Sequence, residues 1–100
     1  MSLMNTYTLE NGVKIPVLGF GTWQTPAGKV ATDAVLAALD AGFTHIDTAE
    51  MYGNEKSIGQ AVKASGIARS DLFITSKLDN QAHTYELATQ ALDRSLSDLQ

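Results

Sequence analysis

The 100-residue chain contains no cysteine, which excludes disulfides, thiolate metal ligands and a thiol nucleophile. It has no apolar run near the roughly 20 residues that cross a bilayer, so we expect no membrane partner. Positive charge is also scarce, with 7 Lys and Arg against 11 Asp and Glu and a net charge of -4. This acidic balance argues against nucleic acid as a partner.

The composition that remains, 44% hydrophobic and 18% charged residues, is typical of one modest globular domain. The first residues carry neither the basic segment nor the apolar core of a signal peptide, so we expect a cytoplasmic protein. Because Met4 offers a second start, we interpret residues 1–3 as a cloning remnant.

Strand and helix patterns alternate along the chain. Strand candidates at residues 6–9 and 14–17 flank an Asn-Gly pair, the strongest local hairpin signal. Three further strands are predicted at residues 17–21, 43–47 and 72–77. Each is followed by a predicted helix, starting near Thr25-Pro26, Asn54 and Thr84, and the first two helices end near Gly42 and Gly66.

Two details of this pattern bear on packing. Gly19 and Gly21 share one face of the strand at residues 17–21, so another group can approach the backbone closely there. The last helix has an apolar stripe that predicts its buried face. Its members are Tyr85, Ala88, Leu92, Leu96 and Leu99.

Repeated strand–helix units of roughly 30 residues predict an α/β fold with a parallel sheet and right-handed crossovers. Two architectures fit, a doubly wound open sheet and the first part of a (β/α)8 barrel, which needs about 250 residues. An open sheet of these units alone would leave an apolar edge where a fourth strand should pair. In both architectures the active site lies at the carboxyl ends of the strands.

Candidate catalytic residues lie at these ends. Asp47 and Lys77 end two predicted strands, and in neighbouring strands about 4.8 Å apart their charges can meet. Tyr52 lies in the loop just after Asp47. A lysine cation within roughly 4–6 Å favours the phenolate, and an adjacent aspartate favours the charged lysine. The three residues together therefore predict a proton donor.

Each of these residues alone is more often structural, because an Asp at a strand end forms turns, a loop Tyr packs and a strand-end Lys is solvated. Their combination favours chemistry. Glu50 and Glu55 flank the same loop and are expected to be solvated or to cap a helix. His45 is expected to pack inside the fold, His83 to be exposed, and no residue set predicts a metal site.

Three motifs give the chain a resemblance to the aldo-keto reductase family. They are LGFGTWQ at residues 18–24, HIDTAEMYGNE at residues 45–55 and ITSKL at residues 74–78. The resemblance covers essentially the whole chain, and the middle motif is highly specific. It implies a (β/α)8 TIM barrel with an N-terminal β-hairpin cap, of which residues 1–100 supply the first three βα units of a single domain. The 100 residues alone are then expected to be inactive, and the full-length protein to be a monomer.

The resemblance also implies an NADPH-dependent enzyme, with NADH as the alternative cofactor. It would reduce aldehydes or ketones to alcohols by direct hydride transfer. In this family pattern Tyr52 matches the proton donor, Lys77 its activating lysine and Asp47 the acid paired with that lysine. The matched positions near the nicotinamide are Gly21, Thr22, Trp23 and Asp47, and those lining the substrate pocket are Trp23 and Met51.

The chain departs from the family pattern at two points. The fourth catalytic residue of the family, a histidine on the next strand, would lie past Gln100. Asp79 stands where many relatives have a tryptophan, which predicts a more polar loop beside the pocket. A second function also fits the resemblance, a cofactor-binding regulatory barrel protein without turnover. The presence of Asp47, Tyr52 and Lys77 together favours the enzyme.

Overall fold

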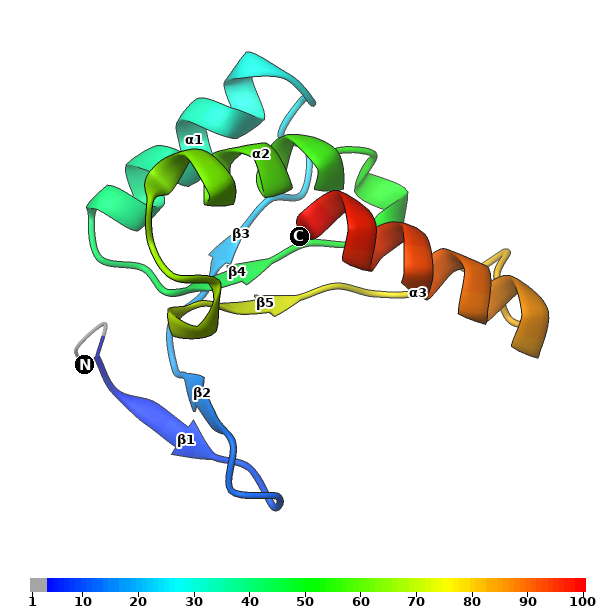
Figure 1. The fold of residues 1–100 in the computed structure, drawn as a ribbon, viewed down its shortest axis with the longest axis horizontal. Helices are drawn as coiled ribbons and strands as arrows, with labels where there is room; N and C mark the ends of the chain where they lie inside the picture. Colours follow the sequence, from blue (N-terminus) through cyan, green and yellow to red (C-terminus); the bar gives the residue numbers. More distant parts are fainter. Residues whose placement is uncertain (1–3) are drawn as a thin grey trace.

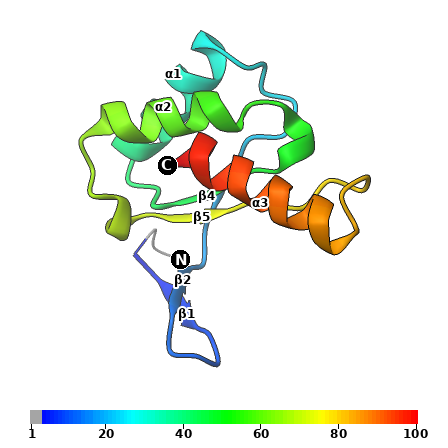
Figure 2. The same ribbon diagram turned by 45° about the vertical axis from the view of Figure 1, so that its right-hand side comes forward.

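The computed structural model describes residues 4–100, and the expected cloning remnant at residues 1–3 lies outside them. The described chain forms a two-stranded hairpin followed by three strand–helix units (Figure 1). Its helices lie together on one side of a three-stranded sheet, and the hairpin projects on the other side (Figure 1, Figure 2). The order of elements is the one predicted from the sequence.

The hairpin pairs β1 (Thr6–Thr8) with β2 (Lys14–Pro16) in antiparallel register. At its tip Gly12 has a φ of 86°, a left-handed conformation that glycine adopts without a side-chain clash. The side chain of Asn11 accepts a hydrogen bond of 3.1 Å from the backbone N–H of Val13. These local contacts close the turn, and the predicted hairpin is confirmed.

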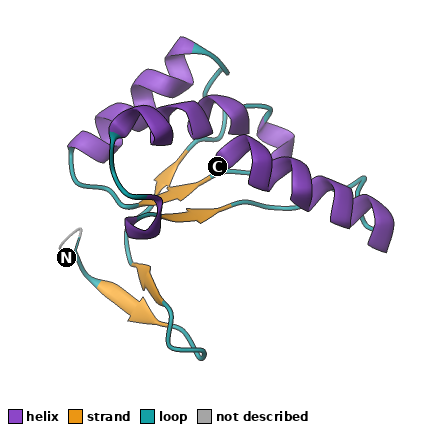
Figure 3. Cartoon of the chain, in the orientation of Figure 1, coloured by secondary structure: helices purple, strands orange, loops and turns teal. Residues whose placement is uncertain are grey.

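The second sheet is parallel, as predicted, and is open within residues 4–100 (Figure 3). Its strand order is β3 (Phe20–Gly21), β4 (His45–Asp47) and β5 (Phe73–Thr75). Gly21, Asp47 and Thr75 lie side by side in register. The last residues of the strands therefore form one row at the carboxyl end of the sheet, which is where chemistry is expected.

The strand predicted at residues 17–21 is shorter than expected. Only Phe20–Gly21 pairs with β4. The backbone N–H of Val17 instead donates a 2.9 Å hydrogen bond to the carbonyl of Asn5, and Leu18 is exposed. The beginning of this segment therefore belongs to the hairpin rather than to the parallel sheet.

Short turns and caps set the limits of the helices. The elements are α1 (Lys29–Asp40), α2 (Glu55–Ser65), α3 (Tyr85–Leu99) and the single-turn 3₁₀ helices η1 (Glu50–Tyr52) and η2 (Arg69–Asp71). Gly66 ends α2 in the left-handed conformation, with a φ of 74°. The Thr84 hydroxyl accepts a 3.2 Å hydrogen bond from the backbone N–H of Leu87, which caps α3. Both ends are as predicted.

The predicted start of α1 at Thr25-Pro26 is wrong. The helix begins at Lys29 and has Gly28, with a φ of 95°, at its N-cap. The carbonyl of Thr25 accepts a 3.1 Å hydrogen bond from the side chain of Asn54, which is 29 residues away. This long-range contact holds the preceding segment in a turn, and no local pattern reports it.

The hydrophobic core lies between the helices and the parallel sheet. Its buried members are Val35, Leu39, Ile46, Ile58, Ala61, Val62, Leu72 and Leu99. Side chains alternate along β4, so Ile46 points into this core while its neighbours His45 and Asp47 point away. The core thereby fixes the orientation of the acid that ends the strand.

The buried face predicted for α3 is largely wrong. Tyr85, Leu92 and Leu96 are 87%, 57% and 62% exposed, whereas Ala91 and Leu99 are buried. The helix packs on α2 through the side that carries these two residues. Periodicity identifies an apolar stripe but does not identify its neighbours, and no other described element covers the exposed part.

Candidate active site

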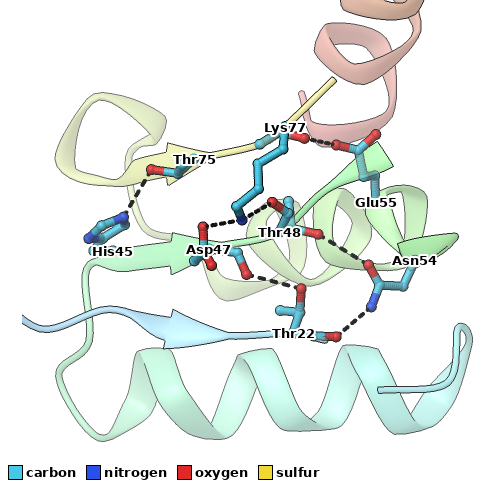
Figure 4. Close-up of polar contacts among 9 residues, drawn as sticks. Thr22, His45, Asp47, Thr48, Asn54, Glu55, Thr75 and Lys77 are labelled. Atoms are coloured by element: carbon cyan, nitrogen blue, oxygen red, sulfur yellow. Dashed lines mark hydrogen bonds and ion pairs between the residues drawn. The ribbon is translucent and has the colours of Figure 1, made fainter. Parts of the chain in front are cut away.

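Asp47 and Lys77 form an ion pair at the carboxyl end of the sheet (Figure 4). The Lys77 Nζ lies 2.7 Å from Asp47 Oδ1, and it donates a second hydrogen bond of 3.0 Å to the carbonyl of Thr48. The side chains of Lys77 and Asp47 are 49% and 39% exposed, so a small molecule can reach them. The prediction that these two charges meet is confirmed, but Lys77 does not end its strand as predicted, because β5 ends at Thr75 and Lys77 follows two residues later.

Tyr52 approaches this pair from the loop after β4. It is the last residue of η1, and Gly53, with a φ of 69°, then turns the chain toward α2. The Lys77 Nζ lies 5.5 Å from the centre of the Tyr52 ring, within the range of cation–ring attraction. Asp47, Tyr52 and Lys77 therefore lie together, and we call them the charged cluster.

The charge of Lys77 is stabilised within this cluster. The hydrogen bond that Lys77 donates to Asp47 raises the pKa of Lys77 above its ordinary value of 10.5, and burial opposes the increase. The charge of Asp47 and the nearby Tyr52 raise the same pKa further. Lys77 is consequently a cation at neutral pH, and it lies beside the Tyr52 ring.

Beside the charged cluster lies a buried polar network of Thr22, Thr48 and Asn54, here called the Asn54 network (Figure 4). These residues are 1%, 0% and 1% exposed. Asn54 donates hydrogen bonds from Nδ2 to the carbonyls of Thr22 and Thr25, at 2.9 and 3.1 Å. Its Oδ1 accepts a 3.2 Å hydrogen bond from the Thr48 hydroxyl, and the Thr22 hydroxyl donates to the Asp47 carbonyl at 3.1 Å. Each side chain of the network thus has a hydrogen-bond partner within the protein.

The sequence predicts Asn54 only as the residue at which a helix starts. The residue stands at the N-cap of α2 as predicted, but its side chain makes no capping hydrogen bond. Its amide binds the loop after β3 instead. An asparagine before a helix is typical of a cap, and the carbonyls that compete for its amide are far away in sequence.

Glu55, expected to be solvated or to cap a helix, is instead buried, with 6% of its surface exposed. Its carboxylate accepts hydrogen bonds from the hydroxyls of Ser76, at 2.5 Å, and Ser95, at 2.8 Å. Because Ser76 directly precedes Lys77, this carboxylate links α2 to the segment that carries the catalytic candidate. Buried carboxylates need such donors, and no sequence signal pointed to these serines.

Glu50 connects the same loop to α3 and to the segment after β5. Its carboxylate forms a 3.1 Å ion pair with Arg94 and accepts a 3.3 Å hydrogen bond from the backbone N–H of Asp79. The side chain of Asp79 in turn accepts a hydrogen bond from the backbone N–H of Gln81. Asp79, where many relatives have a tryptophan, therefore forms a polar turn, as the sequence predicts.

The residues predicted to contact the nicotinamide and the substrate differ in their surroundings. An added Cβ at Gly21 would meet nothing within 4 Å, so the predicted close approach is not made there by the described residues. Trp23 and Met51 are 68% and 65% exposed. The hydroxyl of Thr22 points into the protein, where the backbone carbonyl of Asp47 accepts its hydrogen bond. Gly21, Trp23 and Met51 thus remain open to a ligand.

The close approach predicted at Gly19 is confirmed, because a Cβ there would lie 3.0 Å from Nδ1 of His45. His45 also packs edge-on against Phe73, with ring centres 5.2 Å apart, and its Nε2 lies 3.0 Å from the Thr75 hydroxyl. His45 is half-buried and makes the packing and hydrogen-bond contacts expected of it, and His83 is exposed as expected.

Residues 4–100 contain no group of three or more acidic or imidazole side chains placed to hold a metal ion. Across the same residues, no helix has the length and apolar character required to cross a membrane.

The fold and the position of these side chains define a broad class. It comprises the α/β proteins whose active sites lie at the carboxyl ends of parallel strands. Comparison with known proteins makes this specific. Residues 17–100 match the aldo/keto reductase family, and the chain belongs to that family.

Individual relatives agree with this assignment. Glyoxal reductase of Bacillus subtilis is 44% identical over 99 residues, which are 99% of this chain and 36% of that protein. The crystal structure of an aldo/keto reductase from Brucella melitensis superposes with a TM-score of 0.90 at 48% identity, covering 95% of this chain and 37% of that one. The structure of a Bombyx mori aldo-keto reductase in complex with NADP superposes with a TM-score of 0.86 at 33% identity. The match covers 99% of this chain and 35% of that one. The chain thus spans about a third of the length of these relatives.

Proposed function

We propose that these residues are the N-terminal part of an NAD(P)H-dependent oxidoreductase that reduces aldehydes or ketones to alcohols. The observation that carries the proposal is the charged cluster, in which an exposed lysine cation lies between a carboxylate and a tyrosine ring. We further propose that additional chain completes a (β/α)8 barrel around this site, with the β1–β2 hairpin as its cap. In that case the 100 residues alone are inactive.

The strand end beside the charged cluster fits a flat cofactor ring. Gly21 is aligned with Asp47 in the sheet and has open space where a side chain would be. Trp23 is exposed next to it and offers an aromatic surface. A bound nicotinamide cofactor would supply the hydride to the carbonyl carbon. NADPH is the proposed cofactor because a relative's structure contains NADP, and NADH is the alternative.

Tyr52 donates the proton that the carbonyl oxygen needs when it becomes an alcohol. The phenol loses a proton in this step, and the Lys77 cation stabilises the negative charge that develops on its oxygen. Asp47 holds Lys77 in place and charged. Water restores the proton of Tyr52 after product leaves, since the cluster is accessible to solvent.

The partner of this site is a small carbonyl compound that lies between the Tyr52 hydroxyl and the open strand end. Trp23 and Met51 are proposed to line its pocket, because both expose apolar side chains near the same end of the sheet. The monomeric state and the cytoplasmic location stay predictions.

The proposal is tested with the full-length protein by following NADPH oxidation in the presence of propionaldehyde. Tyr52→Phe removes one oxygen and is expected to reduce the rate by roughly 100-fold or more, since positioned proton transfer contributes about 10²–10⁴. Cofactor affinity and thermal stability should change little. Tyr85→Phe is the matched control, because Tyr85 is 87% exposed on α3 and should retain full activity.

A wild-type protein that binds NADPH but does not oxidise it in the presence of any aldehyde or ketone would contradict the enzyme assignment. It would support the regulatory, non-catalytic alternative instead.

A further inference from the structure

The turn at residues 22–25 exposes Trp23 and has weak support of its own. Gln24 has a φ of 61°, a left-handed conformation that is costly for a residue with a side chain. The turn is closed by one backbone hydrogen bond of 3.2 Å, from Thr25 to Thr22. Its position therefore depends on contacts with other parts of the chain.

The side chain of Asn54 supplies such contacts at both ends of this turn. Its amide nitrogen donates to the carbonyl of Thr22 at 2.9 Å (Figure 4) and to the carbonyl of Thr25 at 3.1 Å. Asn54 and Thr22 are each 1% exposed, so water competes little for the Thr22 carbonyl, whereas Thr25 is half-buried. Buried carbonyls that lose their donor destabilise the conformation in which they are buried. The Asn54 amide thus adds a donor at each end of the turn, beside the two hydrogen bonds that Thr22 donates to the Asp47 carbonyl.

The same side chain is connected to the charged cluster. Asn54 follows Tyr52 by two residues, and its Oδ1 accepts a hydrogen bond from the Thr48 hydroxyl. The carbonyl of Thr48 is the second acceptor of the Lys77 ammonium, at 3.0 Å. The hydrogen bonds of a single side chain therefore run from the Trp23 turn to the residues around the proton donor.

We propose that Asn54 is a positioning residue that fixes the Trp23 turn relative to the charged cluster, and that this placement sets which carbonyl substrates are accepted. The proposal rests on the proposed function, because it gives Trp23 a role in the substrate pocket. Asn54 itself is buried and touches no substrate. Its effect passes through the position of Trp23.

The first test measures the turn directly by hydrogen–deuterium exchange of the full-length protein, followed in peptides that contain residues 22–25. Asn54→Asp keeps the acceptor for Thr48 but replaces the two donors by an oxygen that repels both carbonyls. Exchange in the turn is expected to rise about tenfold, the effect of losing two ordinary hydrogen bonds.

Thr48→Val is the matched variant, because it weakens the same network while leaving both donors of Asn54 in place. Exchange in the turn should change little in this variant. Equal exchange in Asn54→Asp and Thr48→Val would show that Asn54 does not hold the turn. Asn54→Ser, a smaller change, serves if Asn54→Asp does not fold.

The second test compares the KM and kcat of Asn54→Asp for 4-nitrobenzaldehyde and propionaldehyde. A displaced Trp23 removes a surface for the aromatic ring, so the KM for 4-nitrobenzaldehyde should rise about tenfold. The kcat and the KM for propionaldehyde should stay within about twofold, because the proton donor is unchanged. An unfolding defect would instead lower both activities equally.

Faster exchange in the turn with an unchanged ratio of the two KM values would overturn the role of Asn54 in substrate choice. A wild-type protein that reduces neither aldehyde would overturn the proposed function and the substrate role with it. The exchange experiment would still decide whether Asn54 holds the turn.

Discussion

The charged cluster and the Asn54 network are neighbours in the structure and differ in burial. Asp47 and Lys77 are 39% and 49% exposed, whereas Thr22, Thr48 and Asn54 are at most 1% exposed. The first set holds charges where solvent and small molecules reach them. The second holds neutral groups whose hydrogen bonds are made inside the protein.

This difference follows from the cost of burial. Neutral amides and hydroxyls can be buried when each has a partner, but an ion loses far more solvation and needs several donors. Glu55 is the exception in this region, and its carboxylate has two serine hydroxyls. The accessible groups therefore supply reactivity, and the buried groups supply position.

The largest effect is expected when the charged cluster is broken at two points. Lys77→Met removes the cation that stabilises the phenolate and should slow reduction strongly. The double variant Tyr52→Phe with Lys77→Met should be little slower than Tyr52→Phe alone, which loses roughly 100-fold or more. Steady-state kcat of the full-length variants measures this. Losses that multiply would show that Lys77 does not act through Tyr52.

A smaller but still large effect is expected in the buried interior, at Gly59 of α2. A Cβ at this position would lie 1.8 Å from the backbone carbonyl oxygen of Asp98 in α3. Gly59→Ala must separate the two helices, so the free energy of unfolding should fall by about 1–3 kcal/mol or more. Urea unfolding of the full-length protein measures the loss.

Gly21→Ala is the matched control for this stability measurement, since a Cβ at Gly21 meets no atom within 4 Å. It should unfold close to the wild-type midpoint. If both alanine variants lose the same stability, the contact between α2 and α3 is not the cause.

An intermediate effect is expected on cofactor binding at the open end of β3. Gly21→Val fills the space that the described residues leave free beside Asp47. The dissociation constant for NADPH should rise roughly tenfold, or about 1.4 kcal/mol, while the unfolding midpoint changes little. Fluorescence titration with NADPH measures the affinity. Unchanged affinity would place the nicotinamide elsewhere.

The smallest effect is expected from pH. The pKa of Lys77 is raised in the folded protein, so its contribution to stability is complete below 10.5 and declines as pH rises through the higher folded value. The difference in thermal stability between wild type and Lys77→Met should therefore be constant from pH 7 to about pH 9 and shrink only at higher pH. Thermal unfolding of both proteins across this range measures the difference. A difference that shrinks already between pH 7 and 9 would contradict this assignment of charge.

The sequence by itself determined the order of elements, the hairpin turn and the position of the charged cluster. Gly12 and Gly66 adopt the left-handed conformations that their turns require, and this preference is local. Asp47 and Lys77 could be placed together because strand ends in a parallel sheet align: Asp47 is in register with Thr75, and Lys77 follows Thr75 by two residues. Local preference and sheet geometry are both readable from a pattern of residues.

Only the tertiary structure decided which polar groups were buried and which apolar ones were left exposed. Asn54 and Glu55 stand where a cap and a solvated acid were expected, but their partners, Thr25, Ser76 and Ser95, come from distant segments. Leu96 of α3 lies on a predicted core stripe and is 62% exposed. Burial and hydrogen-bond partners depend on where separate elements meet in space, and that arrangement is set by packing rather than by local pattern.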